Sequence, residues 1–131
     1  MAIRLREVHD RTASPYGHST IVRDLLAIAK ANDRSVMTSI ITMLQDLKEY
    51  GHTSKYLKKL KGLPIFELKP RSRGGPTGGA RVYCAFMPSG DAVLLCAEVK
   101  PNLDSAPKGI ERAVRLLKRF IQSEAGKDRR K

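Results

Sequence analysis

Two short segments of the chain place charged and phenolic side chains at the two-residue spacing of a β-strand. Glu67 and Lys69 lie two residues apart in the first segment, and Arg81 and Tyr83 do so in the second. Because alternate residues of a strand project from the same face, each pair shares one face of its strand. If the two strands pair with these faces aligned, Lys69, Arg81 and Tyr83 converge beside Glu67.

Most of these side chains are suited to binding phosphate. An arginine guanidinium is a planar fork that matches two phosphate oxygens and does not lose its charge. Tyr83 can stack on a base or donate a hydrogen bond to a phosphate. Further basic residues flank the two strands: Arg71, Arg73, Lys100, Lys58, Lys59 and Lys61. The pattern predicts a polyanion site that includes Arg81.

Each of these residues also has an ordinary structural interpretation. Arg81 would form a cross-strand ion pair with Glu67 or Glu98. Tyr83 would pack at the edge of the core, and Lys100 would be a lysine at a strand end. Lys69 and the two loop arginines would be solvated.

The charge of the whole chain agrees with a polyanionic partner. Its 131 residues include 25 Lys and Arg against 13 Asp and Glu, a formal net charge of +12. A length of this order suits one domain, which we place at residues 1–126, with a basic, disordered tail at Lys127–Lys131. A small domain this basic most often meets nucleic acid or the ribosome. An acidic protein partner or simple solubility are the alternatives.

Several other classes of protein are excluded by composition. The two cysteines, Cys84 and Cys96, lie in apolar runs where reduced cysteine acts as a small hydrophobic residue. Neither they nor the three histidines have the spacing of zinc ligands, so we expect no metal and no cofactor. No apolar run reaches the roughly 18 residues of a membrane span. The first residues lack the apolar stretch of a signal peptide, which predicts a cytoplasmic protein.

The first half of the chain reads as a strand followed by two helices. Residues 3–8 alternate weakly, as a strand does. Ser19 is a candidate N-cap for one helix, and Asp33 or Ser35 for the next, which ends at Gly51. The apolar stripes of the two helices favour a hairpin packed on a sheet over a dimerising coiled coil.

The second half reads as three strands and a helix. Residues 53–61 are expected to form a basic connector and residues 70–79 a Gly- and Pro-rich loop. Strands are predicted at 64–69, 80–87 and 92–99, the last of them central and covered on both faces. A helix with an apolar stripe begins at Pro107. The predicted fold is α+β, with a three-stranded antiparallel meander.

The register of the last two strands depends on the turn at residues 88–91. A four-residue loop would place Arg81 opposite Glu98, and a three-residue loop would place Cys84 opposite Cys96. A slip of one residue moves every side chain to the other face, so we expected only one of these registers to hold.

The order and spacing of several short motifs between His18 and Phe120 resemble the RelE/HigB superfamily of bacterial toxins, especially its phage-derived Gp49-like branch. The motifs are Gly62-Leu63, Glu67-Leu68-Lys69, Arg81-Val82-Tyr83, Val93-Leu94-Leu95, Val99-Lys100, and Pro107 with Ile110-Glu111-Arg112-Ala113. Cys96 stands where the family usually has His, Glu98 where it has Phe, and Pro101 where it has a second Lys. The resemblance therefore implies a site built from Lys, Arg, Tyr or Glu.

The resemblance implies a RelE-like fold and a toxin-type endoribonuclease. Such an enzyme would cleave RNA, ribosome-associated messenger RNA included, by metal-independent attack of the 2′-hydroxyl. The implied catalytic residues are Arg81, Lys69, Tyr83 and Glu67. The implied partner is an antitoxin, a small helix-turn-helix protein. Two alternatives stay open: a catalytically inactive RNA- or ribosome-binding module of the same fold, and a protein-interaction domain with an acidic partner.

Overall fold

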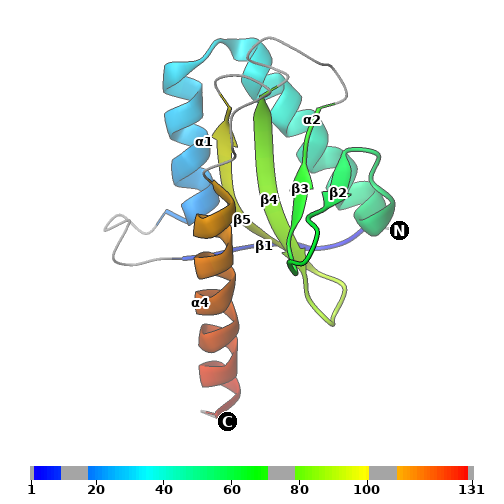
Figure 1. Cartoon of the computed structure of the whole chain (residues 1–131), viewed down its shortest axis with the longest axis vertical. Helices are drawn as coiled ribbons and strands as arrows, with labels where there is room; N and C mark the ends of the chain where they lie inside the picture. Colours follow the sequence, from blue (N-terminus) through cyan, green and yellow to red (C-terminus); the bar gives the residue numbers. More distant parts are fainter. Residues whose placement is uncertain (1, 10–17, 71–78, 101–108, 130–131) are drawn as a thin grey trace.

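The computed structural model describes residues 2–9, 18–70, 79–100 and 109–129. The elements in chain order are β1 (Leu5–Glu7), α1 (Thr20–Ala31), α2 (Arg34–Tyr50), the 3-10 turn η1 (Gly51–Thr53), β2 (Leu57–Lys59), β3 (Phe66–Leu68), β4 (Ala80–Phe86), β5 (Ala92–Val99) and α4 (Gly109–Arg129). Helices α1 and α2 lie on one face of the sheet and α4 on the other (Figure 1). The predicted α+β class is confirmed.

The strands form one mixed sheet in the order β1-β5-β4-β3-β2. Neighbours from β2 to β5 are antiparallel, which confirms the predicted meander, and β1 pairs in parallel with β5. The prediction of a plain connector at residues 53–61 was wrong, because Leu57–Lys59 forms the edge strand β2. Its three residues are too few for an alternating pattern, and backbone pairing with β3 forms the strand.

The predicted helix boundaries rest on local capping. The Ser19 hydroxyl accepts a hydrogen bond from the Val22 N–H at 3.2 Å, and an Asp33 carboxylate oxygen accepts one from the Ser35 N–H at 3.0 Å. Each cap satisfies a backbone donor that the first helical turn leaves unpaired. Gly51 follows α2 with φ of 58°, a conformation that glycine adopts without strain.

Helix α1 also closes an open edge of the sheet. Strand β1 reaches only as far as Leu94 on β5. Beyond that point the Thr20 hydroxyl donates to the Leu95 carbonyl at 2.6 Å. The Ala97 N–H donates to the Asp24 carboxylate at 3.0 Å. Side chains thus replace the missing strand partner, as buried backbone groups require.

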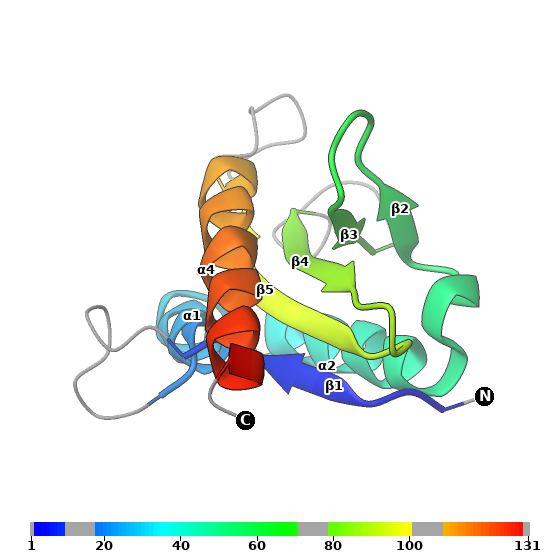
Figure 2. The ribbon, with the colours of Figure 1, turned by 90° about the horizontal axis from the view of Figure 1, so that it is seen from below.

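The core has one layer on each face of the sheet. Val36, Ile40 and Leu47 of α2 pack against one face, and Leu116, Leu117 and Phe120 of α4 pack against the other. Residues 92–97 are buried throughout, as predicted for a central strand covered on both faces. Helix α4 packs against β5 and β4 and leaves β3 and β2 to one side, as the end-on view makes clear (Figure 2).

The β4–β5 hairpin combines the shorter of the two expected loops with the residue pairing expected for the longer one. Cys84 and Cys96 do lie on adjacent antiparallel strands, and Arg81 lies opposite Glu98. The turn is short: the Met87 N–H donates to the Asp91 carbonyl at 2.8 Å across Pro88–Gly90. This turn places Cys84 opposite Leu94, and an irregularity between Tyr83 and Cys84 then shifts the register, so that Tyr83 faces Cys96. A bulge, which sequence periodicity does not reveal, produces the Arg81–Glu98 register.

The C-terminal segment differs from the tail that we expected. Helix α4 continues to Arg129, so residues 127–129 are helical. The predicted helix start at Pro107 and the loop residues Arg71 and Arg73 lie outside the described residues. Among the helices described, none is both long enough and apolar enough to cross a membrane.

Candidate functional site

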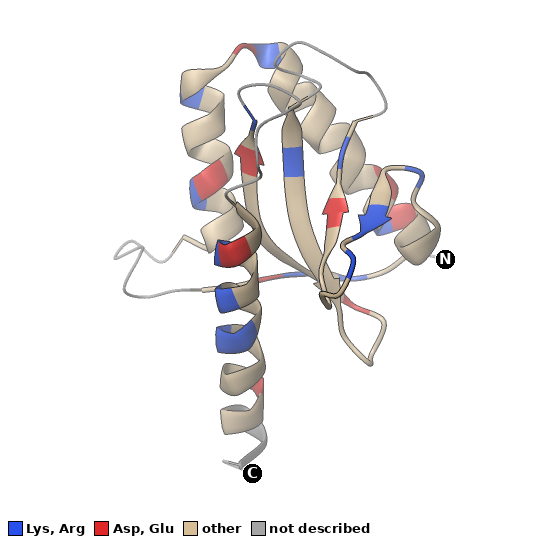
Figure 3. Ribbon diagram, viewed as in Figure 1, with Lys and Arg blue, Asp and Glu red and all other residues tan. Residues whose placement is uncertain are grey.

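Four polar side chains gather on the face of the sheet that α4 partly covers. They are Glu67 on β3, Arg81 and Tyr83 on β4, and Glu98 on β5, and we call them the sheet-face cluster. Glu67 is directly opposite Tyr83, and Arg81 is directly opposite Glu98. Acidic and basic positions therefore neighbour each other across the strands (Figure 3). The shared face predicted for Arg81 and Tyr83 is confirmed.

Arg81 is buried at the centre of the cluster. Only 6% of the residue is exposed, and its Nε lies 3.8 Å from a carboxylate oxygen of Glu67, which is itself 7% exposed. One terminal nitrogen of Arg81 donates to the Ala80 carbonyl at 2.9 Å. The ion pair with Glu67 expected on the sheet surface thus exists in the interior, and the Ala80 hydrogen bond holds the end of the guanidinium.

Tyr83 is locked beneath the start of α4. The residue is fully buried, and its hydroxyl donates to a Glu98 carboxylate oxygen at 2.7 Å. The same oxygen accepts the Gly109 N–H at 2.7 Å, which joins the first residue of α4 to β5. Burial, with the Glu98 hydrogen bond adding to it, raises the pKa of Tyr83 far above its ordinary value, so the phenol stays protonated. A base cannot stack on this fully buried ring in the arrangement observed.

Glycine is required at position 109 by this close approach. A Cβ there would meet the Glu98 carboxylate and would lie 2.7 Å from Cε2 of the Tyr83 ring. No role for Gly109 was predicted from the sequence.

Lysines lie near the cluster on the same face of the sheet. Lys58 is exposed and lies opposite Glu67, so it shares the face of the cluster. Lys69 and Lys100 are half-buried and follow Glu67 and Glu98 by two residues, which places them on the same face by strand alternation. Lys59 projects from the other face, and Lys61 is exposed in the turn before β3. Lys58, Lys69, Arg81 and Lys100 give four basic groups against the two carboxylates of Glu67 and Glu98.

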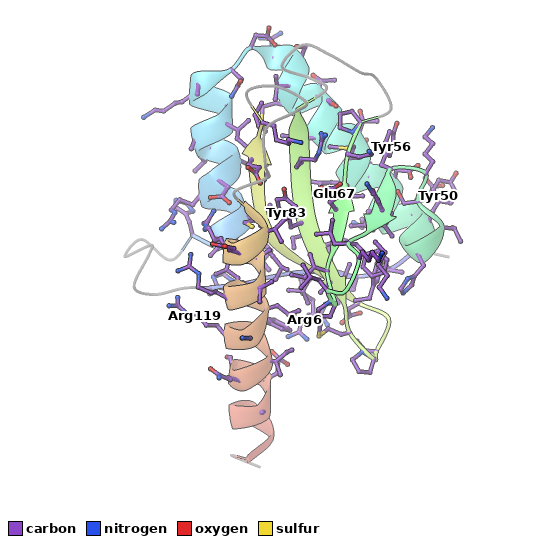
Figure 4. The ribbon with its side chains drawn as sticks, in the orientation of Figure 1. Arg6, Tyr50, Tyr56, Glu67, Tyr83 and Arg119 are labelled. Carbon is purple, nitrogen blue, oxygen red and sulfur yellow. The ribbon has the colours of Figure 1, made fainter. Side chains whose placement is uncertain are left out.

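The structure brings together a second basic site that we did not predict. A cleft of about 370 Å³ lies between β1 and the C-terminal half of α4, lined in part by Arg4, Arg6 and Arg119. Arg6 lies 4.9 Å from the centre of the Phe120 ring and 2.8 Å from a Glu124 carboxylate oxygen. Figure 4 shows the labels of Arg6, from β1, and Arg119, from α4 itself, on opposite sides of this helix. The alternate spacing of Arg4 and Arg6 in a strand was the signal for this cleft.

Neither a metal site nor a reactive thiol is found among the described residues. Within the described residues, no group of His, Cys, Asp and Glu could hold a metal ion. Cys84 and Cys96 are free and buried, as expected of small hydrophobic residues, and burial raises the pKa of both thiols to about 12. Neither thiol is therefore a nucleophile near neutral pH. No protein-family model and no curated protein matches this chain.

Proposed function

We propose that the protein is a RelE/HigB-like toxin that binds RNA over the sheet-face cluster and cleaves it by attack of the adjacent 2′-hydroxyl. The observation that carries the proposal is the position of Arg81. Its guanidinium is oriented by Glu67, and lysines border the same face of the sheet. Four basic groups against two carboxylates leave this face with the excess positive charge that a phosphodiester needs.

The proposed reaction needs a base, an acid and a group that stabilises negative charge on the phosphate. The 2′-hydroxyl attacks the adjacent phosphorus as a base removes its proton, and the bond to the 5′ oxygen breaks as an acid protonates that oxygen. Arg81 would stabilise the charge that develops on the phosphate oxygens, with Lys69 beside it. Glu67 keeps Arg81 in place and is the nearest carboxylate for the role of base. Tyr83 supports the site from below.

A second candidate function has an observation of its own. Arg81 and Tyr83 are both almost completely buried, so the site as observed gives RNA little access to the guanidinium. This burial favours a non-catalytic module that binds RNA or the ribosome through the exposed lysines of the β2 edge. In that case, Arg81 contributes to the fold alone.

The toxin proposal includes a partner. A small helix-turn-helix antitoxin, encoded beside the toxin, would cover part of the basic face and block RNA. Charges at the rim of such an interface speed association and lose their effect in salt. The complex should therefore form more slowly as salt is raised.

The end groups of the RNA products test the proposal. Attack by the 2′-hydroxyl leaves a 2′,3′-cyclic phosphate on one product and a 5′-hydroxyl on the other, and it needs no metal. We expect cleavage of a synthetic RNA in EDTA with these end groups, and no cleavage when the nucleotide at the cut site is 2′-deoxy. Binding without cleavage would favour the second candidate, and the absence of both would contradict each of them.

A further inference from the structure

A stack of aromatic rings lies on the opposite face of the sheet, beside the same edge strand. The His52 ring lies 3.6 Å from the Phe86 ring, centre to centre, with 24° between their planes. Phe66 meets both rings edge-on, at 5.9 Å from His52 and 5.2 Å from Phe86. His52 comes from η1, Phe66 from β3 and Phe86 from β4, so three elements build the stack.

Phe86 stacks on one flat face of the His52 ring, and His52 as a residue is exposed. A further ring can therefore stack only on the opposite flat face, which we call the open face. The turn that carries it is held by local bonds: the Thr53 hydroxyl donates to the Tyr50 carbonyl at 2.8 Å, and the Ser54 hydroxyl to the Asp46 carboxylate at 2.6 Å. The ring is therefore held in place before any ligand arrives, which lowers the entropy cost of stacking.

Basic side chains lie beside the stack. Lys59 is exposed and lies opposite Phe66 on β2. Lys55 is exposed and its Nζ lies 5.4 Å from the centre of the Tyr56 ring. The nearby Asp46 is engaged with Ser54 and with the Lys55 N–H. Figure 4 shows Tyr50 and Tyr56 at this side of the molecule, away from α4. Proteins that bind single-stranded nucleic acid commonly combine aromatic rings, on which the bases stack, with basic side chains that contact the phosphates.

The β2 edge connects this stack to the sheet-face cluster. Lys58 lies opposite Glu67 and Lys59 opposite Phe66, so these consecutive lysines project from opposite faces of the edge strand. No strand of the described chain lies outside β2. A phosphate chain could therefore pass around this edge with a lysine on each side.

We propose that the open face of His52 stacks an unpaired base of an RNA strand that passes around β2 toward Arg81. The inference rests on the proposed RNA binding and adds to it a base-stacking site and a requirement for single-stranded RNA. The strand contacts Lys59 on the stacking face and Lys58 on the face of the cluster.

The test is binding of a labelled single-stranded RNA by the full chain, measured by fluorescence anisotropy over a range of salt. Loss of stacking on one aromatic side chain costs roughly 5- to 150-fold in affinity. We expect His52→Ala to lose affinity in this range and His52→Phe to keep it, because phenylalanine preserves the ring. His18→Ala is the matched control, since His18 is also an exposed histidine and precedes α1, beside the β1 edge.

Salt dependence separates stacking from charge. His52→Ala should leave the log–log slope of affinity against salt unchanged, whereas Lys58→Gln and Lys59→Gln should each reduce it by about 0.7. A self-complementary duplex of the same composition should show no effect of His52→Ala, because its bases are paired. If the wild type binds RNA and His52→Ala matches His18→Ala, the stacking inference is wrong and the proposed function stands. If the wild type binds no RNA, both are wrong.

Discussion

Replacing Arg81 by alanine should destabilise the protein strongly, because it would leave a buried carboxylate without its counter-charge. The Glu67 side chain is 9% exposed and that of Arg81 is 8% exposed. Removing one partner of a buried ion pair costs about 3–5 kcal/mol. The 3.8 Å separation is longer than that of a charge-assisted hydrogen bond, so we expect the lower end of this range, about 3 kcal/mol. A solvent-exposed arginine, as strand alternation alone would predict, contributes about 1 kcal/mol or less.

Urea unfolding followed by circular dichroism measures this cost. Glu67→Gln combined with Arg81→Ala removes both charges, so the double variant should be more stable than the sum of the two single losses by roughly 1–3 kcal/mol. Arg115→Ala, on the exposed side of α4, is the control and should change the free energy of unfolding by less than about 0.5 kcal/mol. An Arg81→Ala variant as stable as Arg115→Ala would refute the buried pair.

Three further predictions concern other parts of the chain. Gly109→Ala should cost roughly 1–3 kcal/mol of unfolding free energy through overpacking against Tyr83, whereas Gly126→Ala on the same helix, where a Cβ meets nothing within 4 Å, should stabilise by about 0.5–1 kcal/mol; equal effects in thermal melts would contradict this packing. The Cys84 and Cys96 thiols hold their protons more tightly in the folded state, so their contribution is complete below pH 9.0, their ordinary pKa, and is lost as pH rises toward about 12. A Cys84→Ala/Cys96→Ala variant should therefore lose less stability than the wild type between pH 9 and pH 11, and parallel pH profiles would argue against thiol burial. Deleting Lys127–Lys131 should reduce the salt slope of RNA binding without abolishing binding, and complete loss of binding would move the RNA site from the sheet to the end of α4.

Most of the predictions that the structure confirms were based on interactions between residues close together in the sequence. Ser19 and Asp33 cap their helices through their own side chains and the next turn of backbone, so neighbouring residues suffice to locate these ends. The apolar run of residues 92–99 identified the central strand, since only a strand covered on both faces has so few polar residues. Chain-local patterns of this kind can be predicted without knowing the rest of the fold.

Long-range pairing accounts for what could not be predicted. The parallel pairing of β1 with β5 joins residues far apart in the chain, and β2 forms by pairing with β3 in spite of its length of three residues. The bulge after Tyr83 leaves no mark in the alternation of β4.

In the candidate site, too, local patterns could be predicted and long-range packing could not. Alternation correctly placed Arg81 and Tyr83 on one face, but it could not show that α4 would lie over that face. Gly109 of α4 lies against Tyr83 and Glu98, and both Tyr83 and Arg81 are buried, which matches the core-edge alternative for Tyr83.

The most direct test of the central claim is a map of RNA 5′ ends after induced expression of the protein in cells. Wild type is compared with Arg81→Lys at matched expression, because lysine keeps a charge near Glu67 but lacks the bidentate fork. Loss of one donor to the reacting phosphate typically lowers the rate by roughly 100- to 1,000-fold. The account predicts new 5′ ends in the wild type and their near-complete loss in Arg81→Lys. Equal cleavage by both proteins would remove Arg81 from the site, and no new ends with the wild type would contradict the endoribonuclease.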